Sequence, residues 1–246
     1  MASTSETGHY IRVANLHLLN THISSFGSPY APTKESISLP NLIVMQLQGE
    51  THITQVQTTK NNWSIAVDKR QERFKDLKKF STRIVGGLFG TNVSQKIIED
   101  AKVINAKIQA STAGRTKPNL PPLQDGQTPA ISISTSRQSY SSLYENFADL
   151  VNLLSNAEGY DVTGTDLSLD YLQQYAAELL EANKNVARAA VEVNTTRIAR
   201  NKFLYKPQAG LVDTAIDAKA YIKGLFGANS PEYKSVSNIS FHNSNK

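Results

Sequence analysis

The sequence contains no cysteine, which excludes disulfide bonds and metal sites built from thiolates. No apolar run approaches the roughly 20 residues needed to cross a bilayer, and the first 20 residues lack the basic and apolar regions of a signal peptide. We therefore expect a cytoplasmic protein without a transmembrane segment.

The motifs of common enzyme classes are also missing. There is no Gly-x-Ser-x-Gly elbow, no Walker loop, no Gly-x-Gly-x-x-Gly and no His-Glu-x-x-His. His17 and His22 are five residues apart, which places them on different faces of a helix, and Glu178 and Glu181 lack the Glu-x-x-His partner of di-iron bundles. We expect a non-enzymatic protein with no catalytic residues, no metal site and no cofactor.

What is present is typical of an ordinary globular protein. Hydrophobic residues make up 39% of the chain and charged residues 19%, enough to bury a core. The net charge of +5 is a mild excess of 26 basic over 21 acidic residues, and it does not by itself identify an anionic partner.

Apolar residues recur at steps of three and four, the pattern of one helix face. One such stripe runs from Leu169 to Leu204, and a weaker one runs from Leu42 to Ile84. Stripes of this length favour long helices that pack at a shallow angle. The sequence predicts an all-α protein, folded as an elongated antiparallel helical bundle.

The chain also contains a faint internal repeat. At an offset of 130 residues Tyr10 matches Tyr140, Tyr30 matches Tyr160 and Leu42 matches Leu172, although His17 falls opposite Phe147. We predict two homologous helical units, residues 1–109 and 139–246, packed as one domain or as two. Residues 110–138 hold four of the nine prolines and are predicted to be a linker or crossover.

The tetrapeptide Gly-Leu-Phe-Gly occurs twice, at 87–90 and at 224–227, each time after an amphipathic segment. It lacks the Lys-Ser/Thr ending of a phosphate loop. We interpret both copies as helix ends, with Leu and Phe available to the core and Gly90 or Gly227 in the left-handed position after the helix.

Further breaks and starts are predicted from local residues. Pro207 should end the long helix of the second unit before a new helix near Leu211, whereas the first unit lacks that break and its helix is expected to run on. A helix is predicted over 94–109, and Ser230 and Pro231 are expected to start a short one.

Two stretches alternate in the manner of strands. They are residues 130–134 (AISIS), where Ile131 and Ile133 are two positions apart, and residues 236–241 (VSNISF), where Ile239 and Phe241 are two positions apart. We predict that they pair as a small two-stranded ribbon.

Two arginine pairs occupy the positions where the apolar stripes become polar. Arg70 and Arg73 form one pair, and Arg197 and Arg200 the other, each three residues apart and therefore on one helix face. They could clamp a phosphate or carboxylate. The alternative, which we favour, is that their stems cover the core and their guanidinium groups pair with acids on a neighbouring helix.

The first pair lies in a basic segment, residues 68–83, that includes Lys78 and Lys79. A row of cations suits nucleic-acid phosphates. Interleaved acids at helical spacing favour local ion pairs on a solvated surface instead. The candidate binding residues are Arg70, Arg73, Lys78, Lys79, Arg197 and Arg200.

Three stretches of the second half resemble a family of uncharacterised bacterial helical proteins: residues 131–154 (ISISTSRQSYSSLYENFADLVNLL), residues 194–227 and residues 229–241 (NSPEYKSVSNISF). The resemblance covers most of the second half and, more loosely, the first. It implies the duplicated helical architecture and a terminal SPEYKxVxxIxF-like tail, and it implies no activity.

These observations lead to three hypotheses of function. The first is a scaffold or interaction protein that binds a protein partner or itself through its helical faces. The second is binding of nucleic acid or an anionic ligand through the arginine and lysine residues. The third is a membrane-active, pore-forming type of helical protein, although no long apolar hairpin tip is present.

Overall fold

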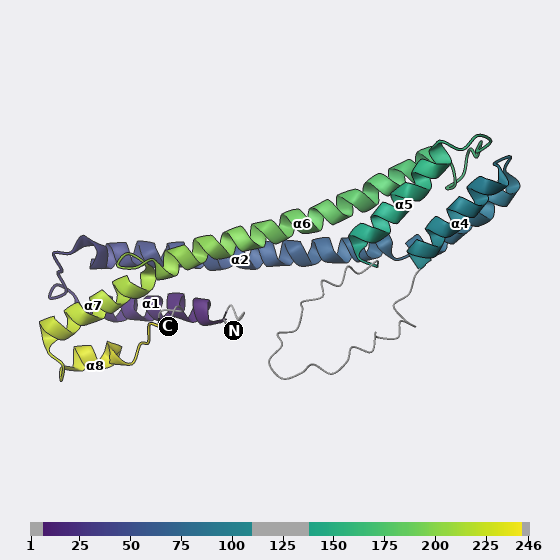
Figure 1. The fold of residues 1–246 in the computed structure, drawn as a ribbon. Helices are drawn as coiled ribbons and strands as arrows, with labels where there is room; N and C mark the ends of the chain where they lie inside the picture. Colours follow the sequence, from purple (N-terminus) through teal and green to yellow (C-terminus); the bar gives the residue numbers. More distant parts are fainter. Residues whose placement is uncertain (1–6, 110–137, 243–246) are drawn as a thin grey trace, which may run out of the picture. The chain divides into compact units, whose positions relative to one another are not determined.

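The computed structural model describes residues 7–109 and 138–242, and all regular structure within these ranges is helical (Figure 1). The all-α prediction is therefore confirmed. The elements are, in chain order, α1 (Thr7–Phe26), a short 3₁₀ helix η1 (Glu35–Ile37), α2 (Leu39–Phe74), α3 (Leu77–Gly87), the 3₁₀ helix η2 (Leu88–Gly90), α4 (Gln95–Gln109), α5 (Tyr140–Ser155), α6 (Leu169–Tyr205), α7 (Leu211–Phe226) and α8 (Pro231–Ser237).

The chain divides into two compact units. Unit 1 comprises Met1–Ser64 and Ala189–Lys246, and unit 2 comprises Ile65–Arg188. The two helices α2 and α6 each begin in one unit and end in the other. The predicted boundaries, 1–109 and 139–246, follow the sequence repeat and do not coincide with these units, because each unit combines segments from both halves of the chain. The predicted linker, 110–138, lies almost entirely outside the described residues.

Unit 1 has a continuous apolar core formed by α1, α7, α8 and the adjoining parts of α2 and α6. Leu16, Leu19 and Leu42 are fully buried in it, together with Ile222 and Val236. Gly49 lies where α2 approaches α1 and α7, and a Cβ atom placed there would meet Val13 at 3.0 Å and Leu211 at 3.3 Å. The absence of a side chain at Gly49 permits this close packing.

Unit 2 has its own core, in which several aromatic rings pack against one another. Phe147 of α5 is fully buried, with its ring centroid 5.4 Å from that of Tyr175 and 6.1 Å from that of Phe80. Phe74 packs edge-on against Tyr140 at 4.9 Å. The apolar stripe predicted along α6 is confirmed at Leu172 and Leu179 in this unit, since both are fully buried.

The two halves of the chain share one local arrangement. The hydroxyl of Tyr30 donates to the carbonyl of Ile37 at 2.7 Å, and that of Tyr160 donates to the carbonyl of Leu167 at 2.5 Å. Burial raises the pKa of both tyrosines. In both halves a long helix starts two residues after the accepting carbonyl. The contacts match at the offset of 130, while the duplication itself stays a prediction.

The continuous helix expected in the first half is wrong. Helix α2 ends at Phe74, Lys75 and Asp76 form a turn, and α3 begins at Leu77. Both Phe74 and Leu77 are buried, so the apolar spacing continues across the break. Periodicity alone could not reveal a turn that leaves the stripe intact. The break predicted at Pro207 is confirmed, because α6 ends at Tyr205 and α7 starts at Leu211.

The Gly-Leu-Phe-Gly segments do end helices, but not in the same way. Helix α7 stops at Phe226, and Gly227 follows with φ of 91°, a backbone region that favours glycine. Helix α3 passes instead into η2, which includes Gly90, and the amide of Thr91 donates to the carbonyl of Leu88. The left-handed conformation predicted for Gly90 is therefore wrong, because the chain continues there as a 3₁₀ turn.

Only one of the two large side chains in each copy contacts the core. Leu88 is fully buried and Phe226 is partly buried against the core of unit 1, whereas Phe89 is 63% and Leu225 is 42% exposed. Successive helical residues point about 100° apart, so neighbours rarely face the same core.

The predicted ribbon is wrong for residues 236–241. Val236 and Ser237 belong to α8, and residues 238–242 form no strand. The alternation is real, because Ile239 and Phe241 are both buried. These side chains pack on the core of unit 1 rather than on a second strand. The other predicted strand, 130–134, lies outside the described residues.

The remaining starts are confirmed. Helix α4 covers Gln95–Gln109, within one residue of the predicted start. The hydroxyl of Ser230 accepts a hydrogen bond from the amide of Tyr233 at 3.0 Å, and Pro231 is the first residue of α8. Both features follow the usual chemistry of a helix N-terminus.

Candidate functional site

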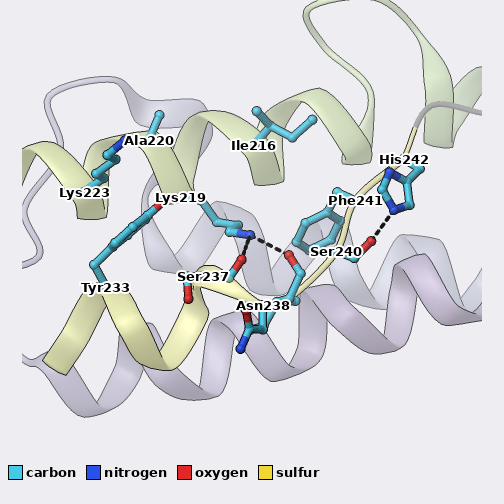
Figure 2. Close-up of a pocket in the computed structure, with 11 residues that line it drawn as sticks. Ile216, Lys219, Ala220, Lys223, Tyr233, Ser237, Asn238, Ser240, Phe241 and His242 are labelled. Atoms are coloured by element: carbon cyan, nitrogen blue, oxygen red, sulfur yellow. Dashed lines mark hydrogen bonds between the residues drawn. The ribbon is translucent and has the colours of Figure 1, made fainter. Parts of the chain in front are cut away.

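Unit 1 contains a pocket of about 460 Å³ between α7, α8 and the segment that follows α8 (Figure 2). We refer to this segment, residues 238–242, as the C-terminal strap. Helix α7 contributes Ile216, Lys219, Ala220 and Lys223 to the lining, and α8 contributes Tyr233. The four residues of α7 have the spacing i, i+3, i+4, i+7, so they lie on one face of the helix.

The C-terminal strap is held mainly through its main chain. The side chain of Arg12 donates to the carbonyl of His242 at 3.0 Å, and that of Asn15 donates to the carbonyl of Ser240 at 2.8 Å. From the other side Lys219 donates to the carbonyls of Ser237 at 2.9 Å and Ile239 at 2.5 Å, as Figure 2 shows. Donors on α1 and α7 thus satisfy the carbonyls that an extended segment leaves without helical partners.

The charge in the pocket is positive. Lys219 and Lys223 are both in the lining, and within 7–109 and 138–242 no Asp or Glu contributes to it. The acidic groups of α7 are engaged elsewhere, because Asp217 pairs with Lys34 at 2.5 Å and Asp213 accepts from the amide of Gln208 at 2.8 Å.

Burial also affects one of the two lysines. It lowers the pKa of the Lys219 ammonium, since the charged form loses solvation. The ammonium of Lys223 lies 5.8 Å from the centre of the Tyr233 ring, a distance that suits a cation–π contact. The pocket therefore combines two cations with an aromatic wall.

The first predicted arginine pair is engaged within unit 2. The guanidinium of Arg70 lies 4.2 Å from the centre of the Tyr140 ring, and Arg73 forms an ion pair with Glu178 at 2.7 Å. The main-chain carbonyl of Arg73 also accepts from the hydroxyl of Tyr175 at 2.9 Å, and burial raises the pKa of Tyr175 to about 12. These contacts are the kind expected from the structural interpretation of the pair.

The lysines of the basic segment are exposed or half-buried on unit 2. Lys79 is within 3.7 Å of Asp76, and Lys78 is half-buried, with its carbonyl accepting from Gln109 at 2.6 Å. Nearby, Arg83 forms a bidentate pair with Asp166 at 2.9 and 3.1 Å. Local ion pairs therefore offset much of the positive charge of this segment.

The second predicted arginine pair belongs to unit 1, so the structure does not assign the four arginines to one compact unit. Arg200 is only 3% exposed, and its Nε and Nη2 atoms donate to Oδ1 of Asn201 at 3.1 and 2.8 Å. Arg197 is half-buried. Burial lowers the pKa of the Arg200 guanidinium.

A polar cluster joins α1 to α2 within unit 1. The buried Asn20 donates to Gln46 at 3.0 Å, and Gln46 contacts His17 at 2.8 Å and Glu50 at 3.0 Å. At the offset of 130 the counterparts of these four residues are Phe147, Leu150, Ala176 and Leu180. The α1–α2 contact is thus polar where the matching contact of the second half is apolar.

Large apolar side chains are exposed on the same two helices. Five of them form what we call the α1–α2 surface, with exposed fractions of 42 to 55%: Ile11, Leu18, Ile43, Val44 and Leu47. Leu18 directly follows His17, and Leu47 directly follows Gln46, so both flank the contact between the helices.

His9 provides a prediction about pH. Its Nδ1 atom is 2.8 Å from the hydroxyl of Tyr205, and burial, then the charges of Arg12 and Arg197, lower its pKa below 6.5. The unfolded chain therefore takes up this proton at a higher pH than the folded chain, and stability present above pH 6.5 is lost as the pH falls.

We expect His9→Asn to reduce the loss of unfolding free energy between about pH 7.5 and about pH 5.5, measured by urea denaturation. Circular dichroism of His9→Asn at about pH 7.5 should match that of the wild type, which shows that the substitution leaves the helical fold intact. An unchanged difference in His9→Asn would contradict the assignment.

The described ranges contain neither a candidate metal site nor a candidate membrane-spanning helix. Within 7–109 and 138–242 no group of three or more His, Asp or Glu side chains could hold a metal ion. In the same ranges none of the helices is both long and apolar enough to cross a membrane.

The pocket was not predicted from the sequence. A signal was present, because Ile216, Lys219, Ala220 and Lys223 share one helix face, on which two lysines lie one turn apart. The prediction that 236–241 pairs with a second strand left no pocket at this position. In the structure the strap contacts α1 and α7 instead.

Comparison of the sequence with protein families and with curated proteins, and of the structure with solved structures, finds no match. The resemblance to a family of bacterial helical proteins therefore stays a prediction.

Proposed function

We propose that this protein is a non-enzymatic scaffold that associates with a second copy of itself through the α1–α2 surface. The observation that carries the proposal is a contrast within the chain. At the offset of 130 the counterparts of the five exposed apolar residues are Ser141, Ala148, Gln173, Gln174 and Ala177. At these five positions the first hairpin thus has large apolar side chains, and the second has small or polar ones.

The charge of the surface favours a second copy as the partner. Between Thr7 and Glu50 the Lys, Arg, Asp and Glu residues are few: Arg12, Lys34, Glu35 and Glu50, the last of which accepts from Gln46. Arg12 donates to the strap, and Lys34 pairs with Asp217. A neutral apolar face does not repel an identical face, and an isologous dimer pairs one patch with itself.

The second hypothesis, binding of nucleic acid by the basic segment, has weaker support. Arg73, Lys79 and Arg83 pair with acids, and Arg70 stacks on Tyr140. Binding a polyanion would compete with these contacts before it could release counterions.

The test is size-exclusion chromatography with light scattering. We expect the wild-type chain to approach twice its monomer mass of 27.0 kDa as the concentration rises. The variant that carries the chain's own counterpart residues, I11S/L18A/I43Q/V44Q/L47A, should dissociate at least about a hundredfold more readily, because its surface buries far less apolar area.

The matched control is V191Q/I198Q, which removes two other apolar residues of unit 1 that are 65% and 60% exposed on α6. It should associate as the wild type does. A wild-type chain that stays monomeric, or a five-residue variant that associates normally, would overturn the proposal.

A further inference from the structure

We propose that the pocket between α7, α8 and the C-terminal strap binds a small organic anion that carries one carboxylate on an apolar body. The proposal is independent of self-association, because the pocket and the α1–α2 surface share no residue. It also differs from the predicted anion site, since it uses neither arginine pair.

The negative charge proposed for the ligand follows from the positive charges that line the pocket. Lys219 and Lys223 are one helical turn apart on the same face of α7. Two ammonium groups at this spacing repel each other unless an anion lies between them or water screens them. Because none of the described residues of the lining is an Asp or Glu, a bound carboxylate would supply the missing negative charge.

The number of free donors favours a single carboxylate. An ammonium has three N–H groups, and Lys219 uses two of them on the carbonyls of Ser237 and Ile239. One N–H of Lys219 therefore remains for a ligand, beside the more exposed Lys223. The lining contains no arginine to form the bidentate fork that favours phosphate.

The apolar body of the ligand follows from the rest of the lining. Ile216 is 45% exposed at one end of the α7 face, Ala220 lies between the two lysines, and the ring of Phe241 borders the same space in Figure 2. A volume of about 460 Å³ falls within the range of small-molecule sites. The pocket thus offers apolar surface next to the two ammonium groups. An inorganic anion has no apolar part that could contact this surface.

The experiment is isothermal titration of the full chain with octanoate, with octylammonium chloride and inorganic phosphate as comparison probes. We expect saturable binding of octanoate and none of octylammonium. Lys223→Gln should weaken octanoate about tenfold, the usual effect of one charge-assisted contact. Lys223 is chosen because Lys219 also holds the strap.

Two control variants make the result specific. Lys234→Gln removes the same charge from an exposed residue of α8 outside the lining, and it should leave binding unchanged. I11S/L18A/I43Q/V44Q/L47A should also bind octanoate normally. Binding lost in that variant would show that octanoate adheres to the α1–α2 surface, and it would overturn the pocket assignment.

Three further outcomes would also contradict the proposal. They are equal binding of octylammonium, octanoate binding that is insensitive to Lys223→Gln, and phosphate binding as tight as that of octanoate. Self-association measured by light scattering should be the same in Lys223→Gln as in the wild type, so the two proposals can fail separately.

Discussion

Replacement of Phe147 by alanine is expected to lower the unfolding free energy by about 3–5 kcal/mol. The side chain is fully buried in unit 2, where it packs against the rings of Phe80 and Tyr175. Alanine would remove the transfer free energy of the ring and leave a cavity that fixed aromatic neighbours cannot close. Urea denaturation followed by far-ultraviolet circular dichroism measures the change.

The matched control is Phe89→Ala. This phenylalanine is 63% exposed, and the ammonium of Lys102 lies 5.1 Å from the centre of its ring. We expect a loss of no more than about 1 kcal/mol. Similar losses for the two substitutions would contradict the packing described for the core of unit 2.

Replacement of Gly159 by alanine is expected to lower the unfolding free energy by about 3 kcal/mol, for two structural reasons. Its φ is 86°, and a Cβ atom there would lie 2.6 Å from the carbonyl oxygen of Asn92 and 2.7 Å from its carbonyl carbon. These are backbone atoms, so no side chain can rotate to make room. The same two segments are joined by a hydrogen bond from the amide of Asn92 to the carbonyl of Gly159 at 3.2 Å.

Gly164→Ala separates the two causes of this loss. Gly164 has φ of 67°, and nothing lies within 4 Å of a Cβ atom placed on it. Gly164→Ala should lower the unfolding free energy by about 1 kcal/mol, the effect of the positive φ alone. Gly159→Ala should lower it by about 2 kcal/mol more, and it should shift the amide resonance of Asn92. Equal losses at the two positions would contradict the close approach of Asn92.

The helical fold could be predicted because its causes are local in the sequence. Stripes of apolar residues place Leu172, Leu179 and Val193 on one face of α6, and each of them is buried. Ser230 and Pro231 start α8 through contacts within four residues. Such signals need no knowledge of distant partners.

Features that depend on distant contacts were not predicted. The turn at Lys75 and Asp76 keeps the apolar stripe in register, so the sequence pattern is the same with or without it. The strap alternates as a strand does, but Arg12 and Lys219, both more than 15 residues away in sequence, hold it. The acid that pairs with Arg73, Glu178, is likewise 105 positions along the chain, beyond any local pattern.

Unit 1 is built from two separate segments of the chain, and this affects the order in which the two units can fold during synthesis. Unit 2 is one continuous stretch, Ile65–Arg188, and a ribosome completes it while much of unit 1 is still untranslated. Val236 and the strap pack in the same core as α1, but they are translated only after all of unit 2. A nascent chain should therefore acquire protease-resistant structure in unit 2 first, and helix α1 should stay sensitive to protease until the strap has been translated.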